Sequence, residues 1–486
     1  MEAAHQSQST VPFSFSGGAR FAFSVALALA AGLGLRLWML KHFFQVNGDT
    51  LIYGAVAKNL LLHGHYALNG AGNELYPTLI RLPGYPLFLA LCFKIFGMEN
   101  YISAAWVQIA LELAGCLLLA DFAGRIAPAR FSRGAAQATL WLAALCPFTA
   151  IYAASPLSES LTLFVLALAL WSAERFRARP GWALALSFTG AVTYAALLRP
   201  DGALVAVALA PALVFGLRRK EGEARLLNGK TFRMAVVCVL LALTPFAAWT
   251  WRNWQVFHVF QPLAPRLATD PGEDLHLGWE RWVKSWCLDF VSTYEIYWNV
   301  PGDVLDVTKL PSRAFDSPAQ YAETAAVAAD YNQKQELTPA LDARFERLAE
   351  QRRAAHPLRT ALWLPLGRMA DMWLRPRVEN LPIDLDWWVY AHHNAETRFS
   401  WAYAALNALY LLLAIAGVWL RPRFWRPMLA YLVLRSALLT TIQAPEARYT
   451  LECFPMLFAL GGLALYRSTT WVCLSVLRAK ASGGSD

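Results

Sequence analysis

A series of apolar runs long enough to cross a lipid bilayer constrains this sequence most. Phe21–Leu35, Met234–Trp249 and Phe399–Leu420 carry almost no charge. A transmembrane helix needs about 20 such residues, whereas transmembrane strands show short segments of alternating polarity. Of the 486 residues, 57% are hydrophobic and only 16% are charged, which is rare for a soluble domain of this length. The sequence therefore predicts an all-α membrane protein.

The apolar runs and the basic residues between them predict about ten transmembrane helices. Arginines cluster in alternate connections, for example at 125–133, 175–179 and 421–426. Such clusters are typical of cytoplasmic loops, so they account for the net charge of +9 without nucleic-acid binding. We expect a multi-pass protein of the cell inner membrane with both termini in the cytoplasm. The predicted spans are residues 20–40, 101–122, 134–152, 157–174, 182–198, 202–217, 234–251, 399–419, 427–443 and 450–466.

Two long connections, 41–100 and 252–398, follow spans that end on the opposite, outer face. Within the first, Leu82–Gly97 is apolar, but it is only 16 residues long and contains Lys94. If this stretch crossed the bilayer, every later arginine-rich loop would face outward. We therefore predict that it lies in the outer interface, together with a second interfacial helix at Asp49–Leu62.

This arrangement divides the chain into three parts. Residues 1–251 form a transmembrane region that includes the first outer loop, 41–100. Residues 252–398 form a mostly helical outer, or periplasmic, domain, because segments such as Tyr321–Asn332 have helical composition. Residues 399–486 form the C-terminal transmembrane helices.

The sequence predicts no disulfide framework, no metal site and no cofactor. Six of the seven cysteines lie in apolar segments, and Cys287 is alone in the outer domain. No spacing of Cys and His is typical of structural zinc. His392-His393, with Glu396 nearby, could suggest a metal, but adjacent histidines point to different sides of a helix.

Three motifs in the first outer loop carry a resemblance to a known family. They read Asn47-Gly48-Asp49-Thr50-Leu51-Ile52-Tyr53, then Asn59-Leu60-Leu61-Leu62-His63-Gly64-His65-Tyr66, then Arg81-Leu82-Pro83-Gly84-Tyr85-Pro86. This pattern resembles the GT-C class of integral-membrane glycosyltransferases, and is similar to the protein O-mannosyltransferases and the bacterial lipid A aminoarabinose transferase. The resemblance covers most of 20–252, is weaker in 427–466, and leaves 270–380 unmatched.

The resemblance implies that residues 1–251 hold a catalytic site on the periplasmic face. The enzyme would move a hexose or pentose from a polyprenyl-phosphate donor to a hydroxyl of an envelope lipid, a glycan or a protein. Such a transfer needs a carboxylate that takes the proton from the attacking hydroxyl. Asp49 is the candidate base, and the resemblance matches Glu159 to a second acidic position. The alternative is that each carboxylate only caps the helix that follows it.

Three arginines lie on outer-face turns that are otherwise nearly free of basic residues. A polyprenyl-phosphate donor needs cations on its leaving phosphate, both for binding and for stabilising the departing charge. The alternative is that these side chains only reach from the bilayer to its interface. The predicted substrate-binding set consists of Arg81, Arg199, Arg448 and the neighbouring Tyr53, Tyr85 and Tyr449.

Two other functions fit a polytopic membrane protein with charged loops. A transporter or flippase of lipid-linked sugars would also need many helices, but transporters tend to show inverted repeats, and none is visible here. A non-catalytic subunit of an envelope-assembly complex would carry inert loop carboxylates. The outer domain of about 147 residues favours neither transport nor a peptide-binding module.

The topology predicts that Arg130 and Asn73 face opposite sides of the membrane. Single cysteines placed at these positions should differ in their reaction with a membrane-impermeant thiol reagent in intact cells. The Asn73→Cys variant should label from outside, and the Arg130→Cys variant only after permeabilisation. Labelling of both from the same side would contradict the ten-span arrangement.

Overall fold

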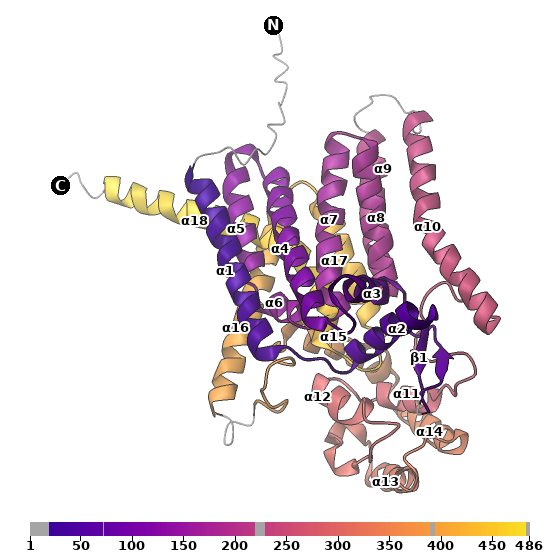
Figure 1. The fold of residues 1–486 in the computed structure, drawn as a ribbon. Coiled ribbons are helices and arrows are strands. Elements are labelled where there is room, and N and C mark those ends of the chain that lie inside the picture. Colours follow the sequence, from indigo (N-terminus) through magenta and orange to yellow (C-terminus); the bar gives the residue numbers. More distant parts are fainter. Residues whose placement is uncertain (1–18, 71, 219–228, 389–393, 483–486) are drawn as a thin grey trace.

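A computed structural model describes residues 19–70, 72–218, 229–388 and 394–482. The described chain is a bundle of long helices with a cap of shorter helices at one end (Figure 1). Its one described sheet has two short antiparallel strands, β1 (Ala67–Asn69) and β2 (Leu75–Pro77). The all-α class predicted from the sequence is therefore confirmed.

Each of the ten segments predicted as spans is helical. The bundle helices are α1 (Ala19–Phe43), α4 (Tyr101–Ile126), α5 (Ser132–Ala144) with α6 (Pro147–Ala153), α7 (Ser158–Ala178), α8 (Trp182–Leu198), α9 (Leu204–Arg218), α10 (Gly229–Phe257), α16 (Asn394–Trp419), α17 (Trp425–Leu439) and α18 (Phe454–Ser482). Among the described residues, five helices are long and apolar enough to cross a membrane, or six if the bent α5–α6 pair is one span. The number ten stays a prediction.

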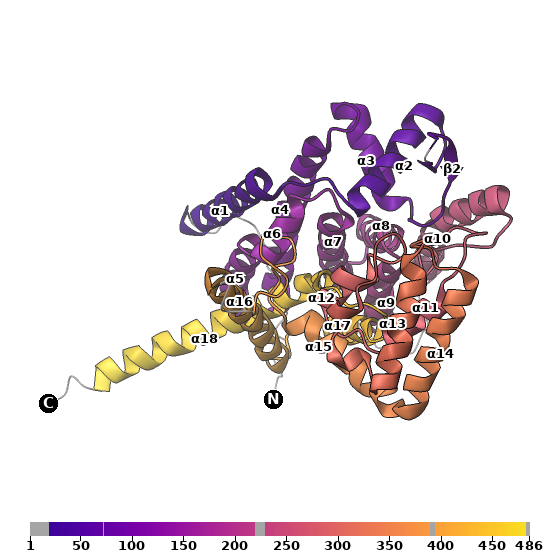
Figure 2. The same cartoon turned by 90° about the horizontal axis from the view of Figure 1, so that it is seen from below.

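The two long connections lie together at one end of the bundle (Figure 1). The first holds α2 (Asp49–His63), the strands and α3 (Gly84–Phe96). Helix α3 lies across the bundle axis, since it is seen end-on in Figure 1 and side-on in Figure 2. This orientation is the one expected for an interfacial helix.

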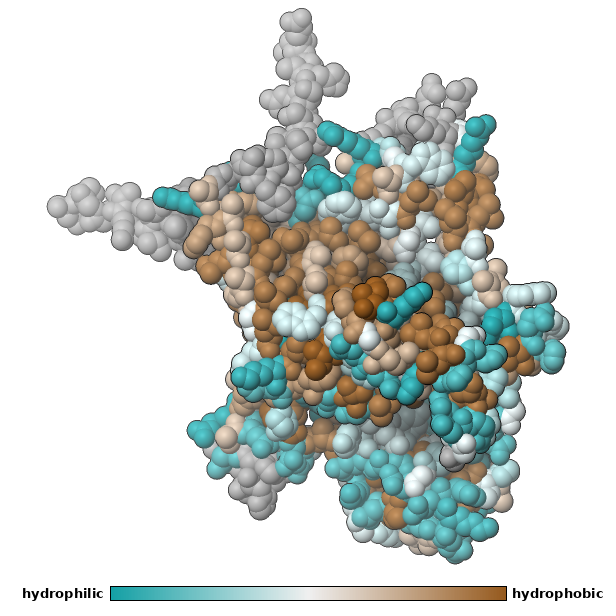
Figure 3. Space-filling model, viewed as in Figure 1, coloured by the Kyte–Doolittle hydropathy of each residue, from teal (hydrophilic) through white to brown (hydrophobic). Residues whose placement is uncertain are grey.

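The second connection folds around its own apolar cluster, in which Trp279, Trp282 and Trp286 are fully buried. Its helices are α11 (Leu277–Lys284), α12 (Phe290–Ser292), α13 (Pro318–Asn332), α14 (Pro339–Ala355) and α15 (Leu364–Leu374). Figure 3 shows polar side chains over this end of the molecule and an apolar belt over the bundle. Helix α10 continues past the boundary predicted at residue 251, and the division into three parts remains a prediction.

A buried ion pair fixes the bend between α5 and α6. Pro147 begins α6 and has no N–H to donate, so the chain bends by 56° at this break. Arg36 of α1 donates to the carbonyl of Ala144 at the end of α5 (2.7 Å) and to Glu112 of α4 (2.7 Å). Gly32, one turn before Arg36, permits this approach, because a Cβ there would lie 2.9 Å from the Cβ of Ala144.

The Arg36–Glu112 pair predicts a large difference between a single and a double substitution. Glu112→Gln leaves a buried guanidinium without its counter-charge and should lower the free energy of unfolding by about 3–5 kcal/mol. Replacing both residues by apolar ones, Arg36→Met with Glu112→Leu, should recover most of this loss. Thermal unfolding in detergent measures both.

The control is Glu99→Gln, which removes the exposed pair with Lys58 (3.0 Å) and should cost less than about 1 kcal/mol. An equal, small effect of Glu112→Gln and Glu99→Gln would contradict a structural role for the buried pair.

Candidate active site

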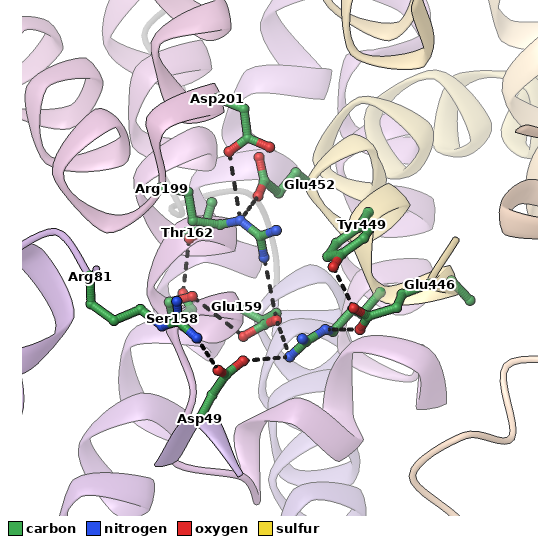
Figure 4. A network of polar contacts seen from close by, with 12 residues as sticks. Asp49, Arg81, Ser158, Glu159, Thr162, Arg199, Asp201, Glu446, Tyr449 and Glu452 are labelled. Atoms are coloured by element: carbon green, nitrogen blue, oxygen red, sulfur yellow. Dashed lines mark hydrogen bonds and ion pairs between the residues drawn. The ribbon is translucent and has the colours of Figure 1, made fainter. Parts of the chain in front are cut away.

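Asp49 lies at the end of the bundle that faces the cap, where two arginines hold its carboxylate. Gly48 has a φ of 48°, which glycine adopts without strain, and the chain then enters α2 at Asp49. Oδ1 accepts from Arg81 (2.7 Å), and Oδ2 faces Arg448 (3.2 Å; Figure 4). The N-cap of α2 is Gly48, and both side-chain oxygens of Asp49 face guanidiniums, so the alternative that Asp49 only caps this helix is wrong.

These contacts also set the charge state of Asp49. Burial would raise the pKa of the Asp49 carboxyl, but the adjacent Arg448 and Arg81 guanidiniums outweigh burial and hold the pKa below its usual value. The carboxylate is therefore ionised at neutral pH, and it is a weak base as long as both ion pairs persist.

Arg448 joins Asp49 to two further carboxylates. Its Nη1 lies 3.8 Å from Glu159 Oε1, and its Nε donates to Glu446. Glu446 also accepts from the hydroxyl of Tyr449, whose ring centre lies 5.7 Å from the Arg448 guanidinium and 5.4 Å from that of Arg199. One guanidinium is therefore shared by three carboxylates.

A second group of charges continues from Glu159 into the bundle. Arg199 lies 3.4 Å from Glu159, 3.6 Å from Asp201 and 3.0 Å from Glu452. Arg435 is fully buried, pairs with Asp201, and lies 2.9 Å from Glu452. We call the connected set the ion-pair network; its members are Asp49, Arg81, Glu159, Arg199, Asp201, Arg435, Glu446, Arg448 and Glu452.

Exposure varies across the network. Side chains of Asp49, Arg81 and Arg448 are 22–24% exposed, and those of Asp201 and Arg199 are 20% and 17% exposed. Those of Glu159, Glu446 and Glu452 are only 2–5% exposed, and Arg435 is fully buried. We call the three most exposed members, Asp49, Arg81 and Arg448, the rim of the network. The deeper pairs hold the rim in place.

Two buried arginines position the segment that carries Arg448. This segment is η7 (Ala447–Cys453), a short 3-10 helix directly before α18. Arg377 donates to the carbonyl of Ala447 (2.9 Å) and to the hydroxyl of Thr450. Arg435 donates twice to the carbonyl of Tyr449 (3.1 and 2.9 Å). The orientation of Arg448 therefore depends on side chains from two other elements.

Tyr53 and Tyr85 form an aromatic pair beside the rim, with ring centroids 4.9 Å apart. The Arg81 guanidinium lies 6.0 Å from the centre of the Tyr53 ring. Tyr85 is fully buried, and its hydroxyl donates to Gln108 (2.5 Å). The buried Tyr85 thus packs against the ring of Tyr53, and Tyr53 is the member of the pair next to Arg81.

Six of the eight residues predicted for the site lie in or against the ion-pair network, and Tyr53 and Tyr85 lie beside it. Four members of the network were not predicted as site residues from the sequence: Asp201, Arg435, Glu446 and Glu452. Glu446 and Glu452 flank the start of a predicted span, where an ionised side chain is costly unless it is paired. That position was the available signal for both glutamates.

The described residues contain no group of three or more His, Cys, Asp and Glu side chains placed to hold a metal ion. The sequence also contains an Asp-x-Asp pair, Asp384 and Asp386. These two residues are not part of any group of three or more His, Cys, Asp and Glu side chains among the described residues. His392 and His393 lie outside the described residues.

Comparisons with known proteins find distant structural neighbours. No protein-family model matches the chain, and no curated protein sequence matches it. Two crystal structures of ArnT from Cupriavidus metallidurans do match, one bound to undecaprenyl phosphate and one in the apo state. Both are 14% identical to this chain with a TM-score of 0.37; the matches cover 91% and 93% of this chain and 78% of ArnT.

A likeness this distant leaves the function to be argued from the chain's own residues.

The exposure of the network predicts that its two ends differ in their effect on stability. Arg435→Met removes the fully buried guanidinium that Asp201 and Glu452 share, which leaves Arg199 as the cation between them, and should lower the free energy of unfolding by about 3–5 kcal/mol. Arg81→Ala removes a partly exposed pair and should cost less than about 1 kcal/mol. Thermal unfolding in detergent compares the two. If Arg81→Ala were as damaging as Arg435→Met, the rim would be a structural part of the protein.

Proposed function

We propose that this protein is a metal-independent glycosyltransferase of the inner membrane. It would take a sugar from a polyprenyl-phosphate carrier and transfer it to an acceptor hydroxyl on the periplasmic face. The observation that carries the proposal is a partly exposed carboxylate, Asp49, held between two partly exposed guanidiniums. These are the two kinds of group that the transfer needs: a proton acceptor, and cations for a leaving phosphate.

Arg81 and Arg448 are the residues best placed to bind the donor phosphate. Both are at the rim, and a guanidinium can donate two parallel hydrogen bonds to phosphate oxygens. Arg199 is somewhat less exposed (17%) and contacts three carboxylates, so its proposed role is to hold Glu159 and Tyr449. Tyr53, beside Arg81, would contact the donor next to its phosphate.

In this proposal, the donor phosphate replaces Asp49 as the partner of the two arginines, so that binding the donor also activates the base. A phosphate that takes hydrogen bonds from Arg81 and Arg448 weakens their pairing with Asp49. Since those ion pairs hold the pKa of Asp49 low, their loss makes the carboxylate a better proton acceptor. Asp49 would therefore become an effective base only when a donor is present.

In the proposed reaction, the acceptor oxygen attacks the anomeric carbon while Asp49 takes its proton. The bond between that carbon and the phosphate oxygen breaks, and polyprenyl phosphate leaves with the bonding electrons. A single displacement of this kind inverts the anomeric carbon. Glu159 would act by holding Arg448 and Arg199 in position. The acceptor is a lipid, a glycan or a protein, and the sugar is a hexose or a pentose.

Asp49→Asn separates catalysis from a structural role of this side chain. The amide has nearly the shape of the carboxylate and its oxygen can still accept a hydrogen bond from an arginine, but it cannot take a proton. Transfer should fall by roughly 10²–10⁴-fold while the thermal midpoint and lipid-phosphate binding survive. Turnover by purified protein, supplied with a panel of polyprenyl-phosphate sugars and envelope acceptors, measures the change. Glu159→Gln should lose less activity than Asp49→Asn.

Glu99→Gln is the matched control, because it removes one carboxylate of the same outer region that pairs only with Lys58 at the surface. It should retain normal turnover. Near-normal turnover of Asp49→Asn would remove the proposed base. Movement of the lipid-linked sugar across vesicles without transfer would favour the transporter instead.

A further inference from the structure

Glu446 is a carboxylate whose presence is unexpected in a site for an anion. It receives hydrogen bonds from Arg448 Nε and from the Tyr449 hydroxyl, and its side chain is 5% exposed. It therefore contacts Nε of the Arg448 guanidinium, whereas the partly exposed Asp49 faces Nη1 of the same group. A phosphate bound to Arg448 would have this buried negative charge as a close neighbour.

The formal charges of the whole network also oppose a bound anion. Its five carboxylates face four guanidiniums, which leaves one formal negative charge when all are ionised. A site selected only for tight phosphate binding would carry an excess of arginine over carboxylate.

The two lipids that such a site meets differ by one charge. A polyprenyl-phosphate sugar is a phosphodiester with one negative charge. The polyprenyl phosphate left after transfer is a monoester, which carries close to two negative charges at neutral pH, since its second pKa is near 6. Coulomb attraction to arginine grows with the charge of the ligand, so an arginine-rich site would bind the product more tightly than the donor.

We propose that Glu446 sets the preference of the site between these two lipids, by weakening its hold on the dianionic product more than its hold on the monoanionic donor. The inference rests on the proposed function. Glu446 is the suitable residue because the Tyr449 hydroxyl fixes it against Arg448, whereas Asp49 faces the acceptor and Glu159 is shared with Arg199. Glu446 thus acts through Arg448, as a positioning residue, and speeds release of the product.

The test compares two probes that differ by one charge and carry no sugar. They are undecaprenyl phosphate and its methyl phosphodiester, titrated into the full chain in detergent at pH 8. Glu446→Gln should tighten binding of both, by about tenfold or more for the monoester. Because Coulomb energy scales with ligand charge, the logarithm of the change should be about twice as large for the monoester as for the diester.

Two variants act as controls. Tyr449→Phe removes the hydroxyl that shares the Glu446 carboxylate, so Glu446 should compete more strongly for Arg448, and the monoester should bind more weakly than to the wild type. This opposite sign keeps the test informative if Glu446→Gln does not fold. Glu99→Gln removes an exposed carboxylate of the same outer region and should change neither affinity.

Unchanged or weaker binding of the monoester to Glu446→Gln would overturn the inference, as would equal changes for the two probes. The proposed function would survive either result as long as the wild type binds both lipids and transfers sugar. A wild-type protein that binds neither lipid would instead remove the proposed function, and the inference with it.

Discussion

The contact of Arg448 with three carboxylates is the interaction on which the rest of the site depends. It joins the partly exposed Asp49 to Glu159 and Glu446, and through them to the buried pairs around Arg435. Ionised groups next to a bilayer are stable only when they are paired, and removing one partner leaves the others as buried charges without a counter-charge. The network therefore holds its members at fixed distances, and the geometry at its exposed rim follows from the pairing beneath it.

Much of the fold follows from the apolar pattern of the sequence. All ten segments predicted as spans are helical, and the apolar stretch 82–97 forms a helix that lies across the bundle. The bend at Pro147 was not predicted, because proline alone does not say whether a helix kinks or ends. What stabilises the bend is Arg36, which comes from a helix more than 100 residues earlier. Such a contact leaves no local trace in the sequence.

Some residues of the site could likewise be predicted from the sequence and others could not. Asp49, Arg81 and Arg448 could be predicted, since each is a charge beside an apolar segment, in a connection that the arginine pattern assigns to the same face. Arg435 could not, because it lies within an apolar helix and its partner Asp201 is 234 residues away. Glu446 was passed over for another reason. Cations are the residues that point to a phosphate site, whereas the charge of Glu446 opposes a phosphate.

The position of η7 near the end of the chain has a consequence for biosynthesis. Asp49 and Arg448 are 399 residues apart, so the first helices enter the membrane long before the arginine that completes the site is translated. Domains generally begin to fold from the N-terminus during synthesis. Until η7 and α18 are in place, Asp49 has only Arg81 as an arginine partner from this set. A chain that ends after α16 would therefore be largely helical but would lack Arg448, and its site would be incomplete. Translation of η7 is the step that completes the site.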